Sequence, residues 1–152
     1  MSKSNDKHYF LITTPKDFEI DLRNKFSLAG FPERYKKSVK NFKSGDKIVY
    51  YIKGKYSFGA ITEVVGDYHY DRTQIWNDWF NLFPVRIKTK PLYFFNKFEN
   101  MISVKEIWDD LNFLKVKKKW GAYFQGSFRN LNKKDYKVIE KAFIERVNKL
   151  KN

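Results

Sequence analysis

The sequence contains no cysteine, and this absence excludes several kinds of structure and chemistry. No disulfide framework, cysteine nucleophile or zinc–thiolate site is available to the chain. Only two histidines are present, and there is no His-Glu-x-x-His motif, glycine-rich phosphate loop, nucleophile elbow or carboxylate cluster at metal spacing. Asp67 and Asp71 could form a catalytic pair, but acids beside tyrosines in a loop are more often turn formers. We therefore predict that the protein is not an enzyme and has no catalytic residues, metal or cofactor.

Long apolar segments are also missing. No run approaches the roughly 18 residues that span a membrane, and the N-terminus, MSKSNDKH, lacks the apolar core of a signal peptide. We expect a cytoplasmic protein without a membrane partner. A length of 152 residues predicts one domain over residues 1–152, with about residues 1–7 as an N-terminal tail. The content of 42% hydrophobic and 19% aromatic residues excludes a disordered chain.

Acidic residues are scarce relative to basic ones. Lysine and arginine together number 31 against 17 acidic residues, which gives a formal charge of +14. A field of this sign favours phosphate polyanions, so nucleic acid is the first partner class to consider. Alternatively, the excess of lysine reflects coding bias and solubility, with the charge spread evenly over a solvated surface.

The beginning of the chain predicts a strand and then a helix. Residues 8–13 are aromatic or branched and are typical of a strand. Thr14 and Pro15 are typical of a helix start. An apolar stripe at intervals of four residues follows, at Phe18, Leu22 and Phe26. We predict that this helix ends at Ala29-Gly30.

A basic segment follows. Phe31-Pro32 constrains the backbone into a turn. Beyond it, apolar residues at helical spacing predict one packed side, formed by Tyr35, Val39 and Phe42. Much of the remaining surface is cationic, with Arg34, Lys36, Lys37, Lys40 and Lys43. These cations could face phosphates or form an ordinary solvated surface.

Residues 45–65 predict a β-hairpin whose turn is Lys53-Gly54-Lys55. Both faces carry aromatic or branched side chains, so we expect both to be covered. One face is predicted to contain Ile48, Tyr50, Phe58 and Ala60, and the other Tyr51 and Gly59. A glycine within a strand indicates a bend or close approach by another backbone or a ligand, as in a small curled barrel.

The next segment, residues 66–83, predicts a long loop rich in aromatic residues. These rings could plug the open end of a barrel, or Trp76 or Trp79 could stack on a base. Residues 84–92 then alternate cleanly and predict a strand with Arg86, Lys88 and Lys90 on one side. On an edge strand such cations protect against aggregation, and they could equally follow a phosphate backbone.

The C-terminal third predicts a helix, a strand and a second helix. Ser103 and Glu106 form a capping box at the first helix start. A basic run at residues 115–119 leads into a predicted strand at 120–129, and Asn132 is expected to cap a terminal helix that packs on the barrel. The order of elements predicts an α+β barrel.

Three segments together resemble one protein family. They are GFPERYKK at residues 30–37, GDKIVYYIKGKYSFGAITEV at 45–64 and KKKWGAYFQGSFRNL at 117–131. In this order and spacing they are similar to the EVE domain of the PUA-like superfamily. The resemblance implies a PUA-like pseudobarrel of five to six mostly antiparallel strands flanked by helices, related in fold to YTH readers of methylated adenine in RNA. It also implies an aromatic-walled pocket for a single, often modified base, and no catalysis.

The resemblance also suggests which residues form the site. It places Thr13, Thr14, Phe31, Tyr51, Gln125, Gly126 and Ser127 around the pocket, to which we add Trp76 and Trp79 as candidate stacking rings. Extruding a base costs a few kcal/mol, and one methyl group returns only roughly 1 to 3 kcal/mol, so much of the affinity must come from cations. We predict phosphate contacts from Arg34, Lys36, Lys37 and Lys53, with Arg86 and Lys88 as a second group.

Three functions remain open at this point. The chain could read a single modified base in DNA or RNA, it could bind nucleic acid without base selectivity, or it could bind a small molecule or act as an enzyme. The sequence does not distinguish DNA from RNA, identify the base or its modification, or indicate an oligomeric state.

Overall fold

The computed structural model describes residues 6–77, 80, 82–113, 124 and 126–151. Their strands are β1 (His8–Thr13), β2 (Leu28–Phe31), β3 (Lys47–Ile52), β4 (Ser57–Tyr70), β5 (Val85–Phe94), β6 (Ile102–Ser103) and β7 (Phe128–Leu131). The α-helices are α1 (Pro15–Arg23), α2 (Lys36–Val39), α3 (Val104–Ile107) and α4 (Lys133–Leu150), and short 3-10 turns are η1 (Glu33–Tyr35), η2 (Phe98–Asn100) and η3 (Trp108–Asp110).

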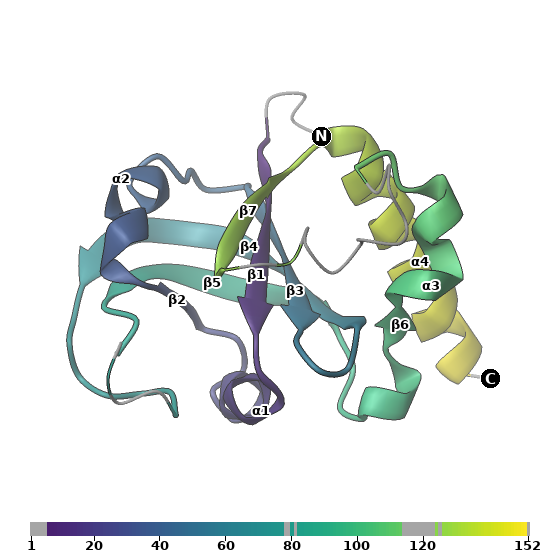
Figure 1. The fold of residues 1–152 in the computed structure, drawn as a ribbon, viewed down its shortest axis with the longest axis horizontal. Coiled ribbons are helices and arrows are strands. Elements are labelled where there is room, and N and C mark those ends of the chain that lie inside the picture. Colours follow the sequence, from purple (N-terminus) through teal and green to yellow (C-terminus); the bar gives the residue numbers. More distant parts are fainter. Residues whose placement is uncertain (1–5, 78–79, 81, 114–123, 125, 152) are drawn as a thin grey trace.

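The strands form one curled sheet in the order β2-β5-β4-β3-β1-β7, with β6 paired to β4. Among the described strands, only β1 and β3 pair in parallel. Helix α1 lies below the sheet in Figure 1, α2 at its left side, and α3 and α4 at its right. The predicted α+β fold, a curled sheet of mostly antiparallel strands flanked by helices, is confirmed.

The central hairpin is confirmed, and both of its faces are buried. Five consecutive residues of β3, from Ile48 to Ile52, are at most 3% exposed. On one face Tyr50 contacts Phe18 of α1. On the other, Tyr51 stacks on Phe124 with ring centroids 3.9 Å apart. Because side chains alternate across a strand, packing on both sides requires the apolar run found here.

A β-bulge changes the predicted faces of this hairpin. Tyr50 pairs with Ala60 and Tyr51 with Phe58, so Gly59 is the extra residue. Phe58 therefore shares the face of Tyr51 rather than that of Tyr50, which corrects the predicted alternation. A Cβ on Gly59 would lie 2.5 Å from Cδ1 of Ile52. The close approach predicted at this glycine is present, but it comes from side chains rather than from a backbone or ligand.

Helix α1 starts as predicted but ends earlier. The hydroxyl of Thr14 accepts a hydrogen bond from the Asp17 amide (3.2 Å) and caps the helix. The predicted end at Ala29-Gly30 is wrong, because the helix stops at Arg23 and the chain reverses through Lys25 and Phe26 at φ 57° and 51°. The following residues then form β2, which pairs with β5.

Other boundaries also differ from the predictions. The basic segment contains only η1 and the short α2, and β4 continues to Tyr70, so the aromatic loop is residues 71–84. Strand β5 lies between β2 and β4, so its cations do not protect a sheet edge. Of the predicted strand at 120–129, the structure describes Phe124 and residues 126–129, and β7 begins at Phe128.

The C-terminal helix α4 is capped and packed as predicted. The predicted Asn132 cap of α4 is present, with Oδ1 accepting from the Asp135 amide (2.8 Å). Phe143 of α4 stacks on Phe95 at 5.2 Å, so this helix packs on the sheet as expected. Residues 1–5 of the predicted N-terminal tail lie outside the described residues. No helix in the described part of the chain has the length and apolar character to cross a membrane.

Candidate functional site

A cavity of about 430 Å³ opens where the C-terminal end of β1 meets the start of α1. The loop 71–84, the residues before β7 and the turn after β2 complete its walls. Seven residues predicted for the base pocket or for phosphate contacts line it: Thr13, Thr14, Arg34, Lys53, Trp76, Gly126 and Ser127. The fold therefore brings these distant parts of the sequence together.

The remaining predicted pocket residues lie elsewhere or outside the described residues. Phe31 is fully buried and packs edge-on against Phe42 and Phe128 in the core. Tyr51 faces the side of the sheet covered by Phe124 and does not line this cavity. Trp79 and Gln125 lie outside the described residues.

Trp76 forms a wall of the cavity and is held on several sides. Its indole Nε1 donates a hydrogen bond to Oδ1 of Asp21 at 2.8 Å. The ring passes close to Gly30, where an added Cβ would lie 2.5 Å from ring carbons. The guanidinium of Arg86 lies 5.3 Å from the ring centroid. Trp76 is only 5% exposed, so it closes the barrel and lines the cavity at the same time.

Arg86 is fully buried beneath this loop, which conflicts with its predicted role as a surface phosphate contact. Its guanidinium donates to the carbonyl oxygens of Thr73, Leu82 and Phe83. It also pairs with the carboxylate of Asp71 at 3.5 Å. These contacts tie together both ends of the loop, and a phosphate would have to displace them to reach Arg86.

Two acids of α1, which the sequence analysis did not assign to the site, form the floor of the cavity. Asp17 accepts from the Asn77 amide at 2.8 Å, and Asp21 accepts from Trp76. Burial, and to a smaller extent the charge of Asp17, raises the pKa of Asp21 to about 8 in spite of the lowering effect of the Trp76 hydrogen bond. At neutral pH the Asp21 carboxyl is therefore mostly protonated, and it offers both a donor and an acceptor.

The spacing of Asp17 and Asp21 is the sequence feature that could have indicated a shared site. They are four residues apart and so share one face of the helix. The spacing alone favours a solvated face, because acids are rarely buried without partners. The partners come from a loop more than fifty residues away in the sequence.

The rim of the cavity is basic. Arg34 and Lys53 are exposed and line the cavity from η1 and from the hairpin turn. Gly126 has φ +80°, and a Cβ there would lie 2.9 Å from the Tyr35 hydroxyl, so a side chain at this position would be both strained and crowded. The backbone of residue 126 thus borders the cavity without a side chain to fill it.

The other predicted phosphate contacts lie outside the cavity. The ammonium of Lys36 sits 5.3 Å from the ring centroid of Tyr70, and Lys40 sits 5.6 Å from that of Tyr68. Lys37 is exposed on α2, and Lys88 is exposed on β5, where its stem would meet a Cβ added at Gly66. Within the described ranges no group of three or more histidine or acidic residues is placed to hold a metal ion.

Comparison with known proteins now identifies the family. The model of the EVE domain matches residues 8–142. The chain belongs to the EVE domain family. A UPF0310 protein of Pyrococcus abyssi is 30% identical over 143 residues, which cover 87% of this chain and 96% of the relative. A UPF0310 protein of Pyrococcus horikoshii is 28% identical and covers 90% and 99%, respectively.

Solved structures of this EVE domain's fold include YTH domains. The Pho92 YTH domain in complex with m6A superimposes with a TM-score of 0.64, at 13% identity over 96% of this chain and 89% of that chain. The YTH domain of Zygosaccharomyces rouxii MRB1, in complex with N6-methyladenosine RNA, gives 0.62 at 11% identity, covering 94% and 90%. At these identities the likeness establishes a shared fold.

Proposed function

We propose that this EVE domain is a non-enzymatic nucleic-acid-binding module. It recognises a single modified base, such as a methylated one, in the cavity beside Trp76. The observation that carries the proposal is a cavity with a basic rim, an aromatic wall and a polar floor. Its volume of about 430 Å³ lies within the range of small-ligand pockets. The YTH domains of the same fold were solved with N6-methyladenosine ligands, which supports a nucleic-acid partner.

The wall and floor have complementary tasks in this proposal. Trp76 and Phe83 supply apolar surface against the base, because every base has a π-face. The Asp21 carboxyl and the Ser127 hydroxyl supply groups for the base edge. Arg34 and Lys53 at the rim neutralise the adjacent phosphates, and Lys36 and Lys37 extend this basic surface.

A binding assay with paired oligonucleotides tests base reading. Single-stranded DNA and RNA carrying a plain or methylated base at one central position are titrated by fluorescence anisotropy at fixed salt. A methyl group in an apolar slot contributes about 1 to 3 kcal/mol, so we expect about 5- to 150-fold tighter binding for one modified base. Equal affinity for every plain and modified pair would contradict the proposal.

A cavity-filling variant separates base reading from general binding. Ser127→Tyr places a ring in the cavity, whereas the exposed Ser38→Tyr on α2 makes the same chemical change outside it. We expect Ser127→Tyr alone to abolish base selectivity. Lys37 on α2 and Lys40 just after it are exposed outside the cavity, and they favour a second candidate function, binding without base selectivity. An unchanged affinity of Ser127→Tyr for every oligonucleotide would support this second function instead.

A further inference from the structure

A second cavity of about 840 Å³ lies at the opposite end of β1 from the base cavity. It is formed by the start of β1, the turn before β3 and the junction between β7 and α4. These segments lie in the upper part of Figure 1. Lysine and asparagine side chains dominate its polar lining: Lys7, Lys43 and Lys133 with Asn41, Asn130 and Asn132. No role in the proposed base reading uses this cavity.

The same two chain segments line both cavities. The segment that contains η1 and α2 contributes Arg34 to the base cavity and Lys43 to the second cavity. The segment around β7 contributes Ser127 to the first and Asn130 to the second. Since β7 ends the order of the main sheet, the junction of these two segments closes the open side of the barrel.

Aromatic rings fill the seam between the cavities. Phe128 of β7 lies 5.4 Å from Tyr35 and 5.8 Å from Phe42 between ring centroids, and Phe42 stacks on Tyr9 at 4.0 Å. Tyr35 and Phe128 are only partly buried. On β1 the first cavity is lined by residues 11–13 and the second by residues 8–9, so the midpoints of the two linings lie about 3.5 residues apart, or about 12 Å. This distance corresponds to about three to four nucleotides at 3.4 Å each in a stacked strand, and to fewer in an extended one.

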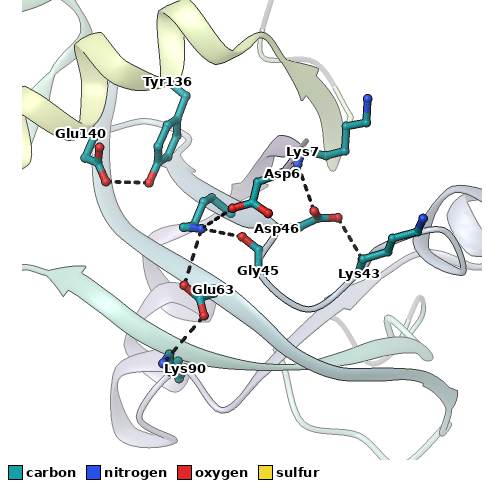
Figure 2. A network of polar contacts seen from close by, with 10 residues as sticks. Asp6, Lys7, Lys43, Gly45, Asp46, Glu63, Lys90, Tyr136 and Glu140 are labelled. Carbon is teal, nitrogen blue, oxygen red and sulfur yellow. Dashed lines mark hydrogen bonds and ion pairs between the residues drawn. The ribbon is translucent and has the colours of Figure 1, made fainter. Parts of the chain in front are cut away.

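The acids at the second cavity already have partners, so its lysines are not neutralised by them. The carboxylate of Asp46 accepts hydrogen bonds from the backbone amides of Lys7 (3.0 Å) and Lys43 (2.9 Å). Figure 2 shows the side chains of both lysines directed away from this carboxylate. Asp6 pairs with Lys47 at 3.4 Å. The cavity therefore combines ammonium groups for a phosphate with amides that donate and accept hydrogen bonds.

We infer that the second cavity binds another nucleotide of the strand whose base enters the first cavity. This inference rests on the proposed function and adds the path of the strand, which runs along the seam of η1, α2 and β7. Lys43 and Lys133 contact a phosphate, Asn130 contacts the sugar or base, and the partly exposed rings of Tyr35 and Phe128 support the nucleotides between. The recognised unit is then several nucleotides long.

Charge-matched double variants test this path. Lys43→Ala with Lys133→Ala removes two cations from the second cavity. Lys97→Ala with Lys149→Ala removes two exposed cations that line neither cavity, and Lys149 lies about 24 Å from Lys133 along the axis of α4. Each protein is titrated with a dinucleotide and a nine-nucleotide single strand that carry the same base, over a series of salt concentrations.

We expect the second-cavity variant to lower the slope of log affinity against log salt by about 1.4 for the long strand, from two contacts at about 0.7 each. That change corresponds to about 25-fold weaker binding at 0.1 M salt. Dinucleotide binding and the control variant should stay near wild type. Equal losses in both double variants, or equal losses for both ligand lengths, would overturn the inference. A wild type that binds the long strand without base preference would instead count against the proposed function alone.

Discussion

The buried carboxyl of Asp21 predicts an unusual dependence of folding stability on pH. It lies at the floor of the cavity, 4% exposed, and accepts the indole hydrogen bond of Trp76. Its pKa is raised from 3.8 to about 8 in the folded protein, with burial as the main cause. The folded protein therefore keeps a proton that the unfolded chain releases above about pH 4. This stabilisation is complete below that pH and is lost progressively as the pH rises to about 8.

The magnitude follows from the linkage between proton binding and folding. Each pKa unit corresponds to about 1.36 kcal/mol. Between pH 6.5 and pH 8 Asp21 is ionised in the unfolded chain but still largely protonated in the folded protein. Unfolding therefore releases a proton, and the free energy of unfolding falls by about 2 kcal/mol over this range. Asp21→Asn keeps a side-chain oxygen for the Trp76 hydrogen bond but cannot ionise. The variant should lack this decline, so its stability relative to wild type should rise by about 2 kcal/mol between pH 6.5 and pH 8.5.

Urea unfolding at several pH values measures this difference. The two proteins are compared at pH 6.5, 7.5 and 8.5 by circular dichroism, and only the change in their difference is interpreted, because any constant effect of the amide then cancels. Glu19→Gln, an exposed acid on the same helix, controls for the loss of a negative charge. Parallel stability curves for wild type and Asp21→Asn would refute the reasoning.

Three further perturbations have defined outcomes. Burial against Tyr136 lowers the pKa of His8 to about 4. The stability contributed by the neutral imidazole should therefore be complete above about pH 6.5 and be lost as the pH falls through 4, and urea unfolding of His8→Phe at several pH values should not show this loss. Gly59→Ala should destabilise the fold by about 1 to 3 kcal/mol in thermal unfolding, because its Cβ would overlap packed side chains, and an unchanged melting temperature would contradict the bulge geometry. Arg86→Ala should lower the free energy of unfolding by about 3 kcal/mol or more, whereas Lys88→Ala on the same strand should lower it by less than about 0.5 kcal/mol. Similar losses of stability in the two variants would argue against the buried role of Arg86.

The predictable parts of the fold were those specified by neighbouring residues. The Thr14 and Asn132 caps and the continuous apolar run of β3 are local signals, and each was confirmed. The end of α1 was missed because the reversal uses positive φ at Lys25 and Phe26, where no glycine indicates it. The side of Phe58 was missed because a bulge shifts the alternation by one residue.

The candidate site was predicted in part for a similar reason. The order of the family motifs grouped Thr13 and Ser127 into one predicted pocket, and both residues line the same cavity. The burial of Arg86 was not predicted, because its alternation with Lys88 and Lys90 is the same for a buried and a solvated cation. Only the loop that folds over β5 supplies the carbonyl oxygens that make burial favourable, and that geometry has no local pattern.

The contacts of Trp76 also constrain how the cavity can hold a base. Arg86 occupies a position over the indole ring, Asp21 takes its only hydrogen-bond donor, and Gly30 leaves room for its edge. The ring therefore has no free polar group, and one of its faces is already taken by the guanidinium. A base in the cavity can meet Trp76 only through its remaining exposed surface, so hydrogen-bond selectivity must come from Asp21, Ser127 and the backbone around Gly126. In the proposed base reader, Trp76 then determines the shape of the site, and the α1 carboxyls, which also hold its loop in place, would couple base recognition to the stability of the fold.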